Sequence, residues 1–69
     1  MDIDYIIEKL VNHGVYSFLI VTNDVLWCKH VLTDVEKQYN TPLSIVYHKN
    51  NQPLDTIKYD GYYVIRHHF

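Results

Sequence analysis

The chain has 69 residues, of which 48% are hydrophobic and 20% charged, and its formal net charge at pH 7 is −2. This length allows at most one domain, which we place at residues 1–69, and the hydrophobic content favours a folded domain over an intrinsically disordered protein. The mild acidity disfavours general nucleic-acid binding, because such binding needs a basic surface that releases counterions from phosphates. The single cysteine, Cys28, excludes an intramolecular disulfide and fits a reducing compartment.

The sequence contains no predicted membrane span or secretory signal. Its longest nearly apolar run, residues 15–21, is far shorter than the ~20 residues that cross a bilayer. The start, Met1 to Asp4, is acidic rather than basic. We therefore expect a cytoplasmic protein without a membrane partner. The absence of alanine and the scarcity of glycine, proline and arginine indicate an AT-rich gene, which favours a phage or viral origin and hence the host cytoplasm.

A helix and a strand are predicted at the start of the chain. Apolar residues recur every three or four positions from Ile3 to Val11, which predicts a helix that Gly14 ends. Residues 15–21 are rich in β-branched and aromatic side chains without clean alternation. They predict a strand that is covered on both faces and is therefore central in its sheet.

A second helix and strand follow. Residues 25–39 predict a helix after the capping sequence Thr22-Asn23-Asp24, and Pro42 lies just beyond its end. Residues 43–49 predict the second strand. Because a strand, a helix and a strand form a βαβ unit, we expect these two strands to run parallel with a right-handed crossover.

The end of the chain predicts a β-hairpin. Residues 54–59 and 62–68 both read as strands, and Asp60-Gly61 between them is typical of a two-residue type I′ turn. With a turn at residues 50–53, the element order is αβαβββ. We therefore expect an α/β (α+β) domain in which two helices pack on a small mixed four-stranded sheet.

The register of this hairpin, extended to the second strand, predicts which side chains share a face. Asp55 faces both His48 and Arg66, which makes a polar row on one face. The other face carries aromatic, apolar and basic side chains: Ile45, Tyr47, Lys58, Tyr63, Ile65 and His67.

The leading functional hypothesis is a small non-catalytic protein-binding module. Tyrosine is favoured in protein interfaces, and an open edge strand offers backbone groups to a partner strand. We expect the C-terminal hairpin to dock on another protein or on a second copy of the chain, as a phage or viral modulator or inhibitor of a host protein does. The expected contact residues are Tyr63, Ile65, His67 and Tyr47.

The first alternative is an anion- or nucleic-acid-binding domain. His48, Arg66 and Lys58 are its expected anion ligands, with the tyrosines of the sheet as stacking partners for bases. Asp55 in that row would orient His48 as a general base, or else form a solvated ion pair worth well under about 1 kcal/mol. Since no nucleophile or Gly-rich phosphate loop accompanies the row, no catalytic residue is assigned and a binding function is favoured over an enzyme.

The second alternative is a single-cysteine redox protein. Trp27-Cys28-Lys29 follows the central strand and opens a helix, a placement that resembles the redox cysteine of the thioredoxin and glutaredoxin proteins. The resemblance implies a thiolate stabilised by the helix N-terminus. The chain departs from the pattern, because Val25 stands where a C-x-x-C partner belongs and no helix is predicted between the second and third strands. We interpret it as a likeness of layout, beside the alternative that Cys28 is a buried small hydrophobe.

No metal or cofactor site is predicted. His67 and His68 occupy successive strand positions and point to opposite faces. Cys28 and His30 lie two residues apart on a helix, where they also point apart. Neither pair has the spacing of a zinc site.

Overall fold

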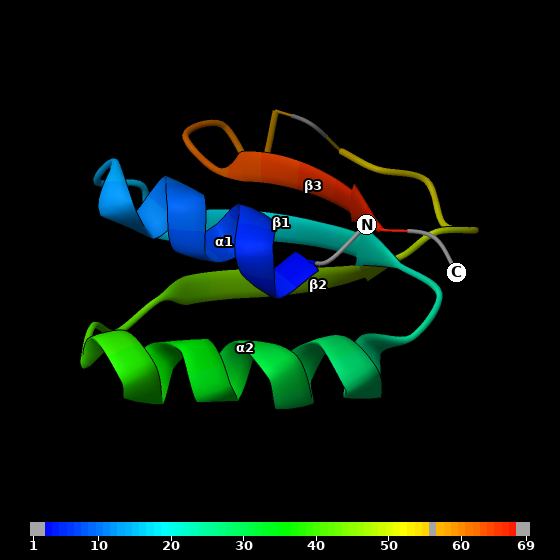
Figure 1. Ribbon diagram of the computed structural model, residues 1–69. Coiled ribbons are helices and arrows are strands. Elements are labelled where there is room, and N and C mark those ends of the chain that lie inside the picture. Colours follow the sequence, from blue (N-terminus) through cyan, green and yellow to red (C-terminus); the bar gives the residue numbers. More distant parts are fainter. Residues whose placement is uncertain (1–2, 56, 68–69) are drawn as a thin grey trace.

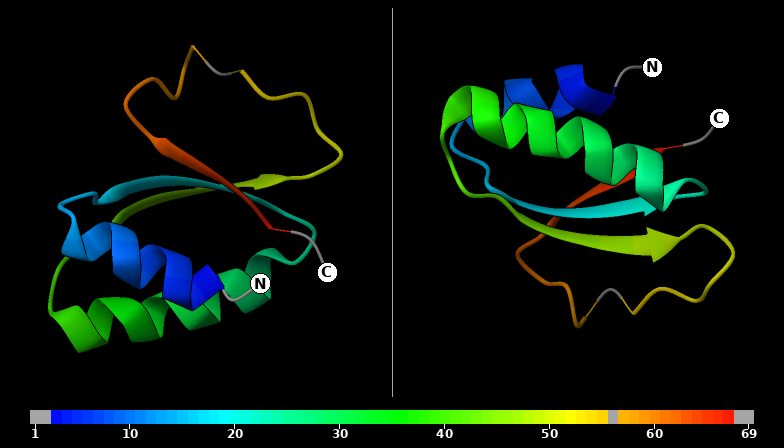
Figure 2. Two further views of the ribbon diagram at one scale, coloured as in Figure 1. Left: turned by 45° about the horizontal axis from the view of Figure 1, so that its top comes forward. Right: turned by 90° about the horizontal axis from the view of Figure 1, so that it is seen from below.

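The computed structural model describes residues 3–55 and 57–67, and these form two helices and three strands. The helices are α1 (Ile3–Asn12) and α2 (Val25–Tyr39), and the strands are β1 (Ser17–Thr22), β2 (Ser44–Lys49) and β3 (Tyr63–His67). The strands run parallel in one sheet of order β2-β1-β3. Both helices pack on one face of this sheet, the helix face (Figures 1 and 2). In the described part of the chain, no helix is long and apolar enough to cross a membrane.

Helix α1 forms where the apolar stripe predicts it. Ile7 and Val11 lie on one side of the helix and are buried in the core. Gly14 ends the helix with a φ of +84°, and its N–H donates to the Val11 carbonyl at 3.0 Å. The Val15 N–H donates to the Leu10 carbonyl, also at 3.0 Å. Together these two bonds form a Schellman cap, which satisfies carbonyls that the end of a helix otherwise leaves unpaired.

Helix α2 confirms the predicted range of residues 25–39 and its cap. The Asp24 carboxylate accepts a hydrogen bond from the Trp27 N–H at 3.0 Å, and Asn40 ends the helix in the left-handed conformation at a φ of 51°. Three side chains of α2 are buried against the sheet: Cys28, Leu32 and Val35. The pairing of Ser17 with Ser44 and of Thr22 with Lys49 confirms that β1 and β2 are parallel.

Strand β1 is central and buried on both faces, as its sequence predicts. Phe18 and Ile20 belong to the core beneath the helices. Leu19 and Val21 alternate with them along the strand, so they are buried on the opposite, rear face of the sheet. The rear face therefore needs a cover of its own.

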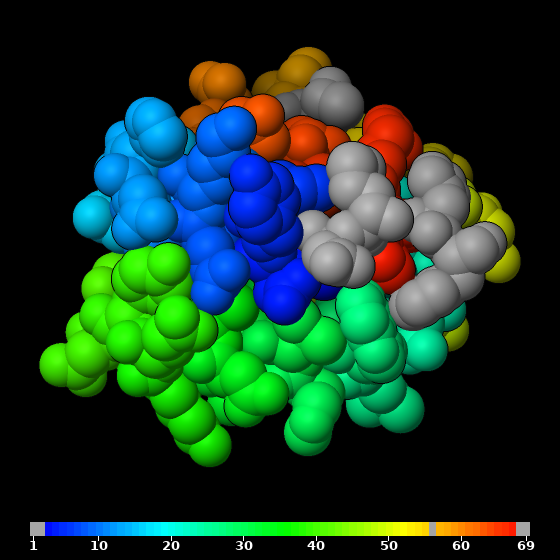
Figure 3. Space-filling model, viewed as in Figure 1, coloured from blue at the N-terminus to red at the C-terminus, as the bar shows by residue number. Residues whose placement is uncertain are grey.

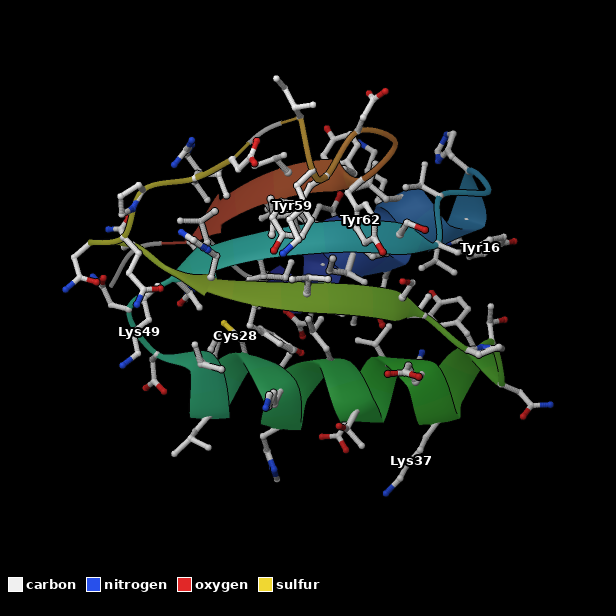
Figure 4. All side chains as sticks on the ribbon, turned by 180° about the vertical axis from the view of Figure 1, so that it is seen from behind. Tyr16, Cys28, Lys37, Lys49, Tyr59 and Tyr62 are labelled. Carbon is white, nitrogen blue, oxygen red and sulfur yellow. The ribbon has the colours of Figure 1, made fainter. Side chains whose placement is uncertain are left out.

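The cover of the rear face is the crossing segment, residues 50–55 and 57–62, which lies on the side of the sheet away from the helices (Figure 2). Tyr59 and Tyr62 of this segment lie over the sheet in the rear view (Figure 4), with their rings edge to face and their centroids 5.9 Å apart. The Tyr62 hydroxyl is 3.3 Å from the Ser44 hydroxyl of β2. These rings shield the apolar side chains of β1 from water.

The predicted hairpin and the mixed four-stranded sheet are wrong. Residues 54, 55 and 57–59 form no strand, and the last strand pairs with β1 instead, with Phe18 opposite Tyr63 and Thr22 opposite His67. Residues 50–55 and 57–62 pass behind the sheet, and β3 then starts on the far side of β1. The predicted last strand agrees with β3 up to His67, whereas His68 lies outside the described residues.

The Asp60-Gly61 sequence does form a turn, but of another type. The Tyr62 N–H donates to the Tyr59 carbonyl at 3.1 Å, which closes a four-residue turn. Gly61 has a φ of +91°, whereas Asp60 has no positive φ. A type I′ turn needs positive φ at both central residues, and a positive φ at the second alone is the pattern of a type II turn. The flanking strands of a hairpin therefore do not follow from this turn.

Candidate functional site

Strand β3 lies at the edge of the sheet and contains three of the four predicted partner contacts. Tyr63, Ile65 and His67 alternate along it and share the helix face, as their spacing predicts. The helices cover most of that face, so Ile65 and His67 are only 6% and 8% exposed, whereas Tyr63 is 48% exposed. Of these three side chains, only Tyr63 can contact a partner without rearrangement.

Tyr47, the fourth predicted contact, lies on β2 opposite Ile20 and packs against the core. It is half-buried, and the Lys29 ammonium lies 5.5 Å from the centroid of its ring. Burial raises the pKa of the Tyr47 hydroxyl to about 12, and the charges of Cys28 and Glu36 act in the same direction. Because β1 lies between β2 and β3, the central strand separates Tyr47 from Tyr63, and the two side chains belong to different surfaces.

A groove lies between α1 and the first residue of β3. It has a volume of ≈ 430 Å³. Its lining combines apolar, aromatic and basic side chains: Tyr5, Ile6, Lys9, Leu10, His13 and Tyr63. In Figure 3 the blue surface of α1 adjoins the orange surface where β3 begins. Tyr5 is 64% exposed, so aromatic rings stand on both sides of the groove.

The outer edge of β3 is open within the described residues. The strand pairs with β1 on one side, and no other described strand pairs with it. In the crossing segment, the Asn50 N–H donates to the Thr22 carbonyl, and the N–H groups of Asp60 and Tyr62 donate to carbonyls within the segment's own turns. Val64 and Arg66 of β3 are exposed on the rear side of the same strand. An open edge of this kind presents backbone donors and acceptors to a further strand.

The expected polar row of His48, Asp55 and Arg66 does not form. His48 and Arg66 lie on either side of Val21 in one row of the sheet. The Asp55 carboxylate instead accepts hydrogen bonds from the backbone N–H groups of Ile57 and Lys58, at 3.1 and 3.4 Å. His48 Nε2 lies 3.1 Å from the Gln52 carbonyl, to which it donates.

Lys58, the third expected anion ligand, lies in the crossing segment. Its ammonium is 5.7 Å from the centroid of the Tyr59 ring, a cation–π distance. Since Val21 separates His48 from Arg66, the structure gathers no cluster of all three residues at the predicted place.

Cys28 is fully buried where β1, β3 and α2 meet. Its thiol donates to the Thr22 hydroxyl at 3.5 Å and lies 3.9 Å from His67 Nδ1, which is itself 3.4 Å from that hydroxyl. The Trp27 ring stacks on the His67 ring at a centroid distance of 5.1 Å. Figure 4 shows Cys28 between α2 and the sheet. Contact between Cys28 and His67 was not expected from the sequence, because the predicted hairpin placed the last strand away from β1.

This environment favours the neutral thiol. Burial raises the pKa of Cys28, the hydrogen bond with Thr22 lowers it in part, and the negative charge of Asp24 raises it further. A reactive cysteine needs the opposite, a stabilised and accessible thiolate. Among residues 3–55 and 57–67, no group of three histidine, cysteine or acidic residues could hold a metal ion.

Comparison of the chain with protein-family models, with curated proteins and with solved structures finds no significant match.

Proposed function

We propose that the protein is a small protein-binding module that takes up an extended segment of a partner protein along β3. The observation that carries the proposal is the meeting of two features at one place, the open outer edge of β3 and the groove beside α1. A segment added to an edge strand gains main-chain hydrogen bonds, and a neighbouring pocket for its side chains adds specificity. Both requirements are present at Tyr63.

The aromatic rim supplies the expected binding energy. At about 25 cal/mol per Å², covering roughly 60 Å² of the Tyr63 ring contributes about 1.5 kcal/mol, close to a tenfold change in affinity. Tyr5 on the other side of the groove provides further exposed aromatic surface. Tyrosine is suited to this because it offers much contact area with few rotatable bonds.

The occupant that we propose is another protein. The amino-acid usage indicates an AT-rich gene, which favours a phage or viral origin. The proposed partner is therefore a host protein, and the proposed role is to modulate that protein. Ile65 and His67 act by holding β3 on the core, since both are buried, and Tyr63 makes the contact.

A random peptide library displayed on phage tests this proposal. Peptides selected on the wild-type protein are expected to lose about tenfold in affinity for the Tyr63→Ala variant, measured by fluorescence anisotropy. The matched control is Tyr16→Ala, because Tyr16 is 47% exposed, close to the value for Tyr63, and does not line the groove. It should change the affinity by less than about twofold.

Two outcomes contradict the proposal. One is that no peptide is selected, or that the selected peptides bind equally well to the Tyr63→Ala variant. The other is a dimeric mass in solution that becomes monomeric in Tyr63→Ala, which would make a second copy of the chain the occupant of the groove.

A further inference from the structure

The groove beside α1 has a chemical character that restricts the segment it can accept. We infer that the partner segment has an apolar side chain and an acidic side chain two residues apart, the first between Tyr5 and Tyr63 and the second beside Lys9 and His13. This inference rests on the proposed function and specifies the ligand of the same site.

The apolar part of the inference comes from the lining. Ile6 and Leu10 are half-buried side chains that pack against the core, and they also line the groove. Tyr5 and Tyr63 add exposed aromatic surface beside them. An apolar side chain in this position removes water from all four.

The acidic part comes from charge. Two of the groove residues, Lys9 and His13, are basic in type, and none of the lining residues is acidic. His13 Nδ1 donates to the Lys9 carbonyl at 2.7 Å, which fixes the imidazole at the rim. The chain as a whole has a net charge of −2 and repels acidic segments in general. The groove is thus a local exception on an acidic protein.

The spacing comes from the dimensions of the two elements. Tyr5 and Lys9 are four positions apart on α1, about 6 Å along a helix axis at 1.5 Å per residue. An extended segment covers that distance in about two residues, at roughly 3.3 Å per residue. Its alternate side chains share a face, so two of them, separated by one residue, can enter the groove.

The test extends the peptide selection. The selected peptides are expected to be enriched in an apolar and an acidic residue two positions apart, and replacing the acidic residue by its amide should weaken binding about tenfold (about 1.4 kcal/mol). The Lys9→Glu variant should weaken the original peptide by a similar factor and should prefer a peptide with lysine at the acidic position. Lys37→Glu is the matched control, because Lys37 lies near the end of α2 and does not line this groove.

The outcomes separate this inference from the proposed function. Peptides that need Tyr63 but show no acidic enrichment, and bind Lys9→Glu as well as wild type, overturn the inference and leave the binding module intact. Failure to select any peptide overturns both. An exchange of preference in Lys9→Glu, with Lys37→Glu unchanged, supports both.

Discussion

At the scale of single residues, burial determines the chemistry of Cys28 and Tyr47. The pKa values of both side chains are raised, and in both the largest cause is the loss of water around the charged form. The neutral thiol of Cys28 also fits its contacts, since it donates a hydrogen bond to Thr22. The contacts of Cys28 with Thr22 and His67 therefore join α2 to β1 and β3.

The first residue-scale prediction concerns Cys28. Because the thiolate is the reactive form and the thiol is buried, we expect alkylation by iodoacetamide at neutral pH to be at least about tenfold slower in the folded protein than in urea. The decay of free thiol measures both rates. A folded-state rate equal to or above the rate in urea would instead support the redox alternative.

The second residue-scale prediction concerns Tyr47 and the stability of the protein at alkaline pH. The unfolded chain releases the hydroxyl proton near a pKa of about 10, whereas the folded protein holds it to about 12. The folded pKa is the higher one, so this contribution to stability is fully present below about pH 10 and is lost as the pH rises towards 12. Urea unfolding across this range should show a steeper loss of stability in wild type than in Tyr47→Phe. Equal slopes would show that Tyr47 titrates alike in both states.

At the scale of elements, local signals define both helices and both strands of the βαβ unit. The apolar stripe and Schellman glycine define α1, and the Asp24 cap and Asn40 define α2. These signals lie within a few residues of the element they specify, so sequence reasoning finds them.

The crossing segment is not predictable from local signals, because the local pattern of residues 54–62 is also that of a hairpin. Tertiary packing, rather than the local pattern, determines that these residues cross behind the sheet. Leu19 and Val21 of β1 are buried on the face opposite both helices, and residues 50–55 and 57–62 lie on that side of the sheet and cover them. The site at Tyr63 and the Cys28–His67 contact both depend on the pairing of β3 with β1. Since the sequence did not predict this pairing, it did not predict the site or the contact either.

One element-scale prediction concerns the end of α1. Gly14 has a φ of +84°, and an added Cβ would meet no atom within 4 Å. The Gly14→Ala variant should therefore lose about 1 kcal/mol of unfolding free energy through backbone strain alone. Denaturant unfolding measures this, with Asn12→Ala as the control, since Asn12 is exposed and helical and alanine should be neutral or slightly stabilising there. No loss in Gly14→Ala would contradict the role of the cap.

At the scale of the whole molecule, the order in which the sheet can be completed follows from its pairing. Residues 17–49 form a βαβ unit of neighbouring elements, whereas Thr22 and His67 meet across 45 positions of the chain. Because the entropic cost of closing a loop rises, though slowly, with its length, β3 is expected to join last. Until then, the edge of β1 that pairs with β3 has unpaired backbone N–H and C=O groups, which can pair with strands of other chains. Of the three described strands β1 is the most hydrophobic, so its exposed edge favours aggregation. In the folded protein β3 pairs with this edge of β1 and protects it from aggregation. The edge strand of the sheet on this side is then β3, whose exposed side chains are Tyr63, Val64 and Arg66.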